Sequence, residues 1–265
     1  MNRRRFIYNS SIASLSVLGL NSCNQLFRDV KITILHSNDV HSQIEPFPVN
    51  HNRFPGRGGF ARRASIFNEI RSVNPNTLIF DAGDIFQGTP YFNFFQGELE
   101  LKLMKEMGYN AATIGNHEFD AGLDILKKNI LSTNFQFIIS NYDFVNTELE
   151  GLTTPYKIYK KEGVKIGVFG LGIELKGLVN PILYKETKYY DPIEISDEMV
   201  KILKDEKKCD LIICVSHLGH EYNSNKISDT KLAQLTSDID LIIGGHTHTF
   251  LKEPLITKNK INKNV

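Results

Sequence analysis

Leu-Ile-Ile-Gly-Gly-His-Thr-His, residues 241–248, is the stretch of sequence that says most about the fold. Three consecutive apolar residues at 241–243 predict a short, buried strand. Two glycines follow and permit a close approach of the backbone, and His246 and His248 then occupy alternate positions. The strand therefore ends in a loop whose two imidazole side chains can bind a metal or transfer a proton.

The same alternation of strand and polar loop recurs along the chain. Further apolar runs predict strands at 30–35, 77–80, 111–114, 135–139, 165–171 and 211–215. Stretches with helical periodicity lie between them at 60–73, 98–107, 122–131, 196–204 and 228–235. This order predicts an α/β fold with an at least partly parallel sheet. A hairpin around Glu162-Gly163 would make the sheet mixed.

Polar clusters follow five of the predicted strands. Ligands of open α/β sheets bind beyond the carboxyl ends of the strands, so we expect these clusters to converge at one edge. The candidate ligands are Asp39, His41, Asp84, Asn116, His217, His246 and His248. Their oxygen and nitrogen atoms suit Zn, Mn or Fe. Seven ligands are too many for one catalytic ion, but they suit two ions that share a carboxylate.

Less specific interpretations apply to several neighbouring residues. A single histidine is more often a packed or loop residue than a ligand, and we expect this of His36, His51 and His220, of which His220 is the nearest to a supporting role. Asp81 is expected to support its loop through hydrogen bonds. The aromatic cluster at 91–95 could stack a nucleobase, but packing in the core is favoured.

The first residues have the layout of an export signal. Three arginines at 3–5 precede a mildly apolar stretch at 7–20, which predicts a signal peptide over residues 1–22, with a short buried helix as the alternative. The arginine pair resembles a twin-arginine signal, and the residues up to Cys23 resemble a lipobox. We therefore expect an exported bacterial protein that is periplasmic or anchored to the membrane as a lipoprotein through Cys23.

Composition excludes some partners. The chain has 31 Lys and Arg against 30 Asp and Glu, and without the three arginines of the leader the basic count falls to 28. Net charge thus gives no support to nucleic-acid binding. Cys209 and Cys214 lie in or beside one apolar run and are predicted to be free thiols.

The polar clusters also carry a family resemblance. Asp39-x-His41, Gly83-Asp84, Gly115-Asn116-His117-Glu118, His217 and 244–248 together resemble the calcineurin-like metallophosphoesterase superfamily. The stretches 37–41, 81–89 and 116–120 resemble its 5'-nucleotidase branch, over about residues 30–265. The resemblance implies a metallophosphatase fold, a four-layer αββα sandwich of two mixed β-sheets flanked by helices.

The resemblance also implies residue roles. Asp39, His41 and His248 would hold one divalent ion, such as Zn or Mn. Asn116, His217 and His246 would hold the other, with Asp84 bridging. His117 and Asp120 would form the catalytic dyad.

The implied function is a dinuclear-metal phosphoester hydrolase, a 5'-nucleotidase-like phosphomonoesterase that uses a metal-bridging hydroxide. Alternative substrates of the same site are 2',3'-cyclic nucleotides, UDP-sugars and thiosulfate esters. The chain could also be a catalytic half that needs a separate substrate-binding partner, or an inactive, metal-loaded surface lipoprotein.

The sequence departs from this branch after its last motif. Branch members usually carry a C-terminal domain that holds the nucleoside, whereas 17 residues follow His248. We therefore expect residues 23–265 to be a C-terminally truncated catalytic domain, with a separate C-terminal-domain protein as a partner. The tail at 258–265 is expected to be a solvated terminus or the turn of a hairpin whose returning strand begins at Val265.

Overall fold

Two four-stranded sheets form the centre of the computed structural model, which describes residues 29–265. The predicted export signal and Cys23 lie outside the described residues. Residues 32–265 form one compact unit. No helix within residues 29–265 is long and apolar enough to cross a bilayer. Cys209 and Cys214 are both free, as predicted.

The first sheet is parallel throughout. Its strands, in spatial order, are β1 (Thr33–Ser37), β2 (Thr77–Asp81), β3 (Ala111–Ala112) and β4 (Gln136–Phe137). Helices connect each strand to the next, and such crossovers produce parallel neighbours. The expectation of two mixed sheets is therefore wrong for this one.

The second sheet is mixed. Its order is β10 (Leu241–Gly244), β9 (Leu211–Ser216), β7 (Val164–Leu171) and β6 (Tyr156–Lys161). The first three strands are parallel, and β6 pairs with β7 in the opposite direction. The predicted turn joins β6 to β7, with positive φ values of 47° at Glu162 and 91° at Gly163.

Alternate residues of the strands face two different cores. In β2, Leu78 and Phe80 lie in the core between the sheets, whereas Ile79 belongs to the core under the first group of helices. In β9, Ile213 faces the shared core and Ile212 faces the second group of helices. The sheets thus pack face to face, as alternation along a strand requires.

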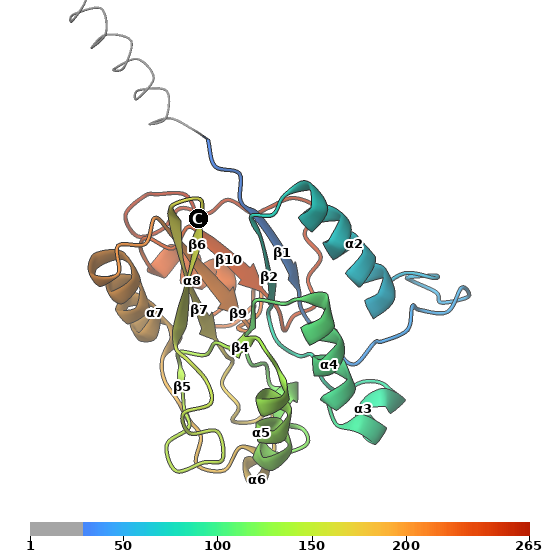
Figure 1. The fold of residues 1–265 in the computed structure, drawn as a ribbon. Coiled ribbons are helices and arrows are strands. Elements are labelled where there is room, and N and C mark those ends of the chain that lie inside the picture. Colours follow the sequence, from blue (N-terminus) through green and yellow to red (C-terminus); the bar gives the residue numbers. More distant parts are fainter. Residues whose placement is uncertain (1–28) are drawn as a thin grey trace, which may run out of the picture. The chain divides into compact units, whose positions relative to one another are not determined.

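Helices cover both outer faces and complete four layers (Figure 1). On the first sheet lie α2 (Phe60–Val73), α4 (Glu98–Met107) and α5 (Leu123–Ser132). On the second sheet lie α7 (Pro192–Val200), continued by a π-helical segment at Lys201–Glu206, and α8 (Asp229–Leu235). The αββα architecture expected from the sequence is confirmed.

Helix α7 begins four residues earlier than predicted. The Asp191 side chain accepts hydrogen bonds from the backbone of Ile193 and Glu194, and Pro192 occupies the first turn. This cap is favourable because it satisfies donors that have no partner within the helix. The smaller elements are η1 (His117–Phe119), α6 (Pro181–Tyr184), and the paired strands β5 (Tyr142–Asp143) and β8 (Lys188–Tyr189).

The expectation about the aromatic cluster is wrong in part, and that about the tail needs one correction. In α3 (Pro90–Phe95), Phe94 is 80% exposed and Phe95 50%, so these rings are not core residues; Phe92 does pack against the core. The tail forms the hairpin given as the alternative, since Thr257 and Val265 exchange two backbone hydrogen bonds of 3.1 and 2.9 Å, although most residues of 258–265 are exposed. Its returning arm begins before Val265, because Asn264 already pairs with Lys258 in an antiparallel bridge.

Candidate active site

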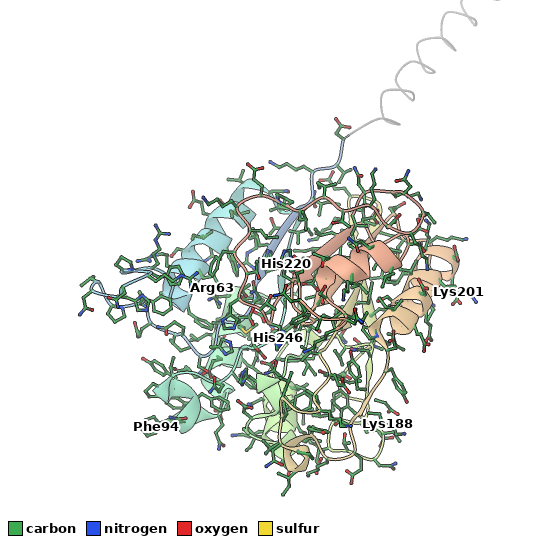
Figure 2. All side chains as sticks on the ribbon, turned by 180° about the vertical axis from the view of Figure 1, so that it is seen from behind. Arg63, Phe94, Lys188, Lys201, His220 and His246 are labelled. Atoms are coloured by element: carbon green, nitrogen blue, oxygen red, sulfur yellow. The ribbon has the colours of Figure 1, made fainter. Side chains whose placement is uncertain are left out.

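The predicted site residues lie where strands of both sheets end. Asp39 and His41 follow β1, and Asp84 follows β2. From the second sheet, His217 follows β9, and the two histidines at 246 and 248 follow β10. Asn116 and His117 come after β3, at the start of η1. Figure 2 shows His246 near the middle of the view.

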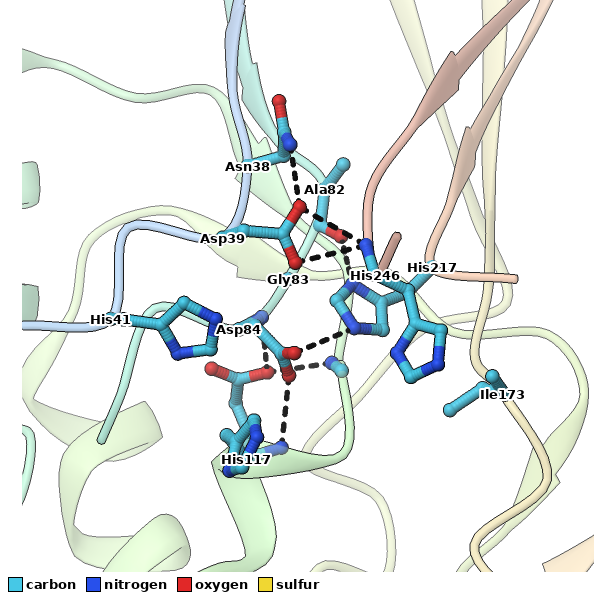
Figure 3. Close-up of polar contacts among 12 residues, drawn as sticks. Asn38, Asp39, His41, Ala82, Gly83, Asp84, His117, Ile173, His217 and His246 are labelled. Atoms are coloured by element: carbon cyan, nitrogen blue, oxygen red, sulfur yellow. Dashed lines mark hydrogen bonds and ion pairs between the residues drawn. The ribbon is translucent and has the colours of Figure 1, made fainter. Parts of the chain in front are cut away.

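The backbone of these loops is strained. Five of the site residues are non-glycine residues in the left-handed region, with φ of 49° at Asp39, 48° at His41, 55° at Asp84, 74° at His246 and 50° at His248. This region is unfavourable for residues with a Cβ, and it persists where the surroundings impose it, often at functional sites. After these sharp turns, the side chains of Asp39, His41 and Asp84 point toward the region where His246 lies (Figure 3).

Glycines make the close approach of the loops possible. A Cβ on Gly83 would lie 2.7 Å from the Gly115 nitrogen and 2.9 Å from His217 Nδ1. A Cβ on Gly115 would lie 2.3 Å from Asp84 Oδ1. Only residues without a side chain fit at these two positions.

Several contacts join the loops of the first sheet to those of the second. Both carboxylate oxygens of Asp39 accept from the backbone N–H of His246, at 2.9 and 3.0 Å. Asp84 Oδ2 lies 3.0 Å from His217 Nε2. Nε2 of His41 lies 3.0 Å from Nε2 of His248. Each sheet therefore contributes one side of the same site.

The possible ligand atoms fall into overlapping clusters. Asp39, His41 and His248 form one, and Asp84, His217 and His246 form another; within each, the ligand atoms lie within 4.8 Å of one another. A third cluster combines His41 and Asp84 with His117. Asp84 thus belongs to two clusters.

Three buried atoms of candidate ligands lack hydrogen-bond partners, namely Asn116 Oδ1, His246 Nδ1 and His217 Nε2, the last of which lies 3.0 Å from Asp84 Oδ2. An unpaired polar atom in the interior is costly, and a bound cation would satisfy such an acceptor. Carboxylate, amide and imidazole donors are also the ligands that divalent ions such as Zn and Mn accept. The residues present therefore fit such ions.

The imidazoles differ in protonation. Burial lowers the pKa of His246 to about 4 and also lowers the pKa of His41, so both are neutral near pH 7, the form that coordinates metals. Burial also opposes charge on His217, but the adjacent Asp84 carboxylate raises its pKa to about 10. Burial likewise favours the neutral form of Asp84, but His217 holds the pKa of this carboxyl well below its usual range. A bound cation would take the place of the His217 proton.

His117 and Asp120 form a pair beside the clusters. Nδ1 of His117 lies 2.7 Å from Asp120 Oδ2, across the short helix η1. This hydrogen bond raises the pKa of His117. The predicted dyad is therefore in contact, although its catalytic role stays a prediction.

Supporting residues surround the site. Asp81 accepts from Ser37 Oγ at 2.5 Å and from the Gly83 backbone at 3.0 Å, in line with its predicted supporting role, and burial raises its pKa to about 7. His220 takes part through its backbone, which donates to Thr247 Oγ1 at 2.9 Å. Glu118, to which the sequence patterns assign no role, is completely buried. The one sequence signal for Glu118 is its position in the polar cluster that follows β3.

Comparisons with known proteins show which family has this architecture. The family model for the calcineurin-like phosphoesterase matches residues 32–250. The snake venom 5'-nucleotidase of Gloydius brevicauda is 34% identical over 233 residues, covering 83% of this chain and 37% of the relative. The 5'-nucleotidase of Vibrio cholerae is 34% identical over 248 residues, covering 88% of this chain and 43% of the relative. The chain thus spans less than half the length of these relatives.

A solved structure agrees with these relatives. The 5'-nucleotidase precursor from Thermus thermophilus has a TM-score of 0.78 at 30% identity and is matched over 88% of this chain and 47% of its own. The family match covers both sheets and all the loops that form the site. This chain belongs to the calcineurin-like phosphoesterase family.

Proposed function

We propose that this protein hydrolyses phosphomonoesters of nucleotides, in the manner of a 5'-nucleotidase, with two divalent ions. The observation that carries the proposal is the pair of clusters built across the two sheets, with Asp84 within reach of both sheets' histidines. One ion would be held by Asp39, His41 and His248. The other would be held by Asn116, His217 and His246, with Asp84 between the two.

The chain's own residues would orient and protonate the substrate. The two ions would supply an activated water and positive charge beside the phosphate oxygens. His117 donates Nδ1–H to Asp120, so its other ring nitrogen is the one that can hold a proton for the leaving oxygen. The raised pKa of His117, caused by this hydrogen bond, keeps that proton available closer to neutral pH.

The first test combines metal content and activity. The full chain, purified with Mn²⁺ or Zn²⁺, should retain about two ions per chain by elemental analysis, the number that a shared-carboxylate site holds. It should release phosphate from AMP. Fewer than two ions, or two ions without hydrolysis of AMP or of bis-p-nitrophenyl phosphate, would contradict the proposal.

A substrate panel separates the candidate substrates of this site. A 2',3'-cyclic nucleotide, a UDP-sugar and a thiosulfate ester should be compared with AMP at equal concentration. If one of them had a higher kcat/KM than AMP, that compound would be the better candidate for the substrate. Activity that appears only with an added nucleoside-binding domain would instead favour a catalytic half that works with a partner.

We also propose that the chain is exported. The support is the order of Arg3-Arg4, the apolar stretch and Cys23. Replacing both arginines with lysine should retain the chain in the cytoplasm of a bacterial host, as measured by fractionation. Cys23→Ala should abolish labelling by radioactive palmitate; export and labelling that both survive these changes would refute the proposal.

A further inference from the structure

The buried side chain of Glu118 joins the two loops that follow β2 and β3. Oε1 accepts from the backbone N–H of Ile85 at 2.7 Å and of Phe86 at 3.4 Å. Oε2 accepts from the backbone N–H of Asp84 at 2.9 Å and of Gly115 at 2.6 Å. One carboxylate, 0% exposed, thus satisfies four backbone donors.

A bond in the opposite direction closes the same junction. Asp84 Oδ1 accepts from the backbone N–H of His117 at 2.9 Å. Each loop therefore supplies one carboxylate that binds the backbone of the other. Glu118 itself lies in η1, and both of its oxygens accept only from backbone N–H groups among the described residues.

These contacts hold Asp84 in its strained conformation. Asp84 has a φ of 55°, which is unfavourable for a residue with a side chain. The bond from its N–H to Glu118 fixes the peptide plane, and the bond from His117 fixes the carboxylate. With both in place, Oδ2 is free to point at His217.

We propose that Glu118 is a positioning residue that sets the orientation of Asp84 and so tunes the affinity of both ions. The inference rests on the proposed function, since it needs Asp84 to serve two ions. Hydrogen-bond partners of metal ligands affect affinity because they fix the geometry of the ligand atoms. Glu118 acts through the backbone of Asp84 and of Gly115, not by contact with an ion.

The substitution Glu118→Gln tests the acceptor role with almost no change of shape. A glutamine has one oxygen and one NH₂ group, so in either orientation its NH₂ faces two backbone N–H donors. Titration of the full chain with Mn²⁺ alone, followed by electron paramagnetic resonance, should show both dissociation constants raised by about 10- to 100-fold. The signal of two coupled Mn²⁺ ions should weaken at the same time.

The matched control is Glu100→Gln. Glu100 is equally buried, on α4, and neither of its carboxylate oxygens has a hydrogen-bond partner. This variant should bind Mn²⁺ like the wild type. If Glu118→Gln, folded by circular dichroism, also binds Mn²⁺ like the wild type, the inference is wrong.

Two further outcomes are decisive. A wild type that binds no Mn²⁺ pair refutes the proposed function itself, which separates that failure from a failure of the inference. If Glu118→Gln does not fold, Glu118→Asp replaces it: the shorter carboxylate keeps the charge but cannot reach all four donors. Its Mn²⁺ dissociation constants should rise in protein that is folded by circular dichroism, and unchanged constants would overturn the inference.

Discussion

The two sheets reach the same edge with different chemistry. The first sheet brings two carboxylates, an amide and one imidazole, on Asp39, Asp84, Asn116 and His41, whereas the second brings three imidazoles. The buried carboxylates behind them differ as well. Glu118, behind the first sheet's loops, accepts from four backbone N–H groups, whereas Asp229, behind the second, accepts from one hydroxyl, that of Ser216, at 2.6 Å.

The difference shows how the site divides its tasks. The loops of the first sheet are locked by backbone bonds in strained conformations, so their carboxylates are fixed before any cation arrives. The histidines of the second sheet are oriented by contacts to Asp39 and Asp84 of the first sheet. We call this line of contacts between the loops of the two sheets the seam. Ligands that are already held in position would limit the cost of binding a cation.

The largest effect on metal binding and activity is expected from a change of Asp84, whose carboxylate faces the second sheet. Asp84→Asn removes the carboxylate that faces His217 at 3.0 Å and that belongs to two clusters. Both ions should bind more weakly together, and the loss of phosphatase activity should exceed the roughly 10⁴-fold upper range for a lost acid or base. Elemental analysis and AMP turnover measure both quantities.

The pattern of metal loss is informative in itself. If Asp84→Asn lost only one ion, Asp84 would not be the shared ligand. A comparison with His248→Asn, which touches one cluster, supplies the control. That variant should lose one ion and retain the other.

A change in the His117–Asp120 dyad should lower activity by less and should leave the contacts between the two sheets unchanged. His117→Asn removes the ring bonded to Asp120 but keeps the backbone N–H that donates to Asp84. We expect a fall in kcat of roughly 10²- to 10⁴-fold, the usual weight of acid–base catalysis, with metal content near that of the wild type. An unchanged kcat would exclude His117 as the acid.

The packing of the two sheets can be tested on a single strand. Gly170 of β7 faces the first sheet, and a Cβ there would lie 1.9 Å from the carbonyl oxygen of Ile138. Gly170→Ala should destabilise the fold by about 1–3 kcal/mol or more, because overpacking forces backbone atoms apart. Urea unfolding measures this free energy.

Gly167 of the same strand is the control. A Cβ there would meet the ends of the Leu203 and Cys209 side chains, at 2.9 and 3.1 Å. Flexible side chains yield more readily than backbone, so Gly167→Ala should cost less. Equal costs would mean that the two sheets adjust more easily than their close packing indicates.

The sequence was sufficient for much of this architecture. Helices α2 and α4 begin and end where the periodicity predicts, and the histidine loop after β10 lies at the expected edge. The role of Glu118 could not be predicted, because its four donors come from two loops brought together only by the fold. The exposure of Phe94 could not be predicted either, because composition does not reveal which side of a short helix packs against the core.

The smallest effect concerns the second sheet's own carboxylate. Burial raises the pKa of Asp229 to about 7 from 3.8. Between these values the folded chain binds more protons than the unfolded chain, so Asp229 lowers the unfolding free energy as pH rises through this range. Asp229→Asn keeps an acceptor for Ser216 and removes this titration. Relative to the wild type, the variant should therefore gain roughly 1–3 kcal/mol between about pH 4 and pH 7, measured by urea unfolding. Parallel curves for the two proteins would mean that other contacts behind the second sheet compensate the buried charge of Asp229.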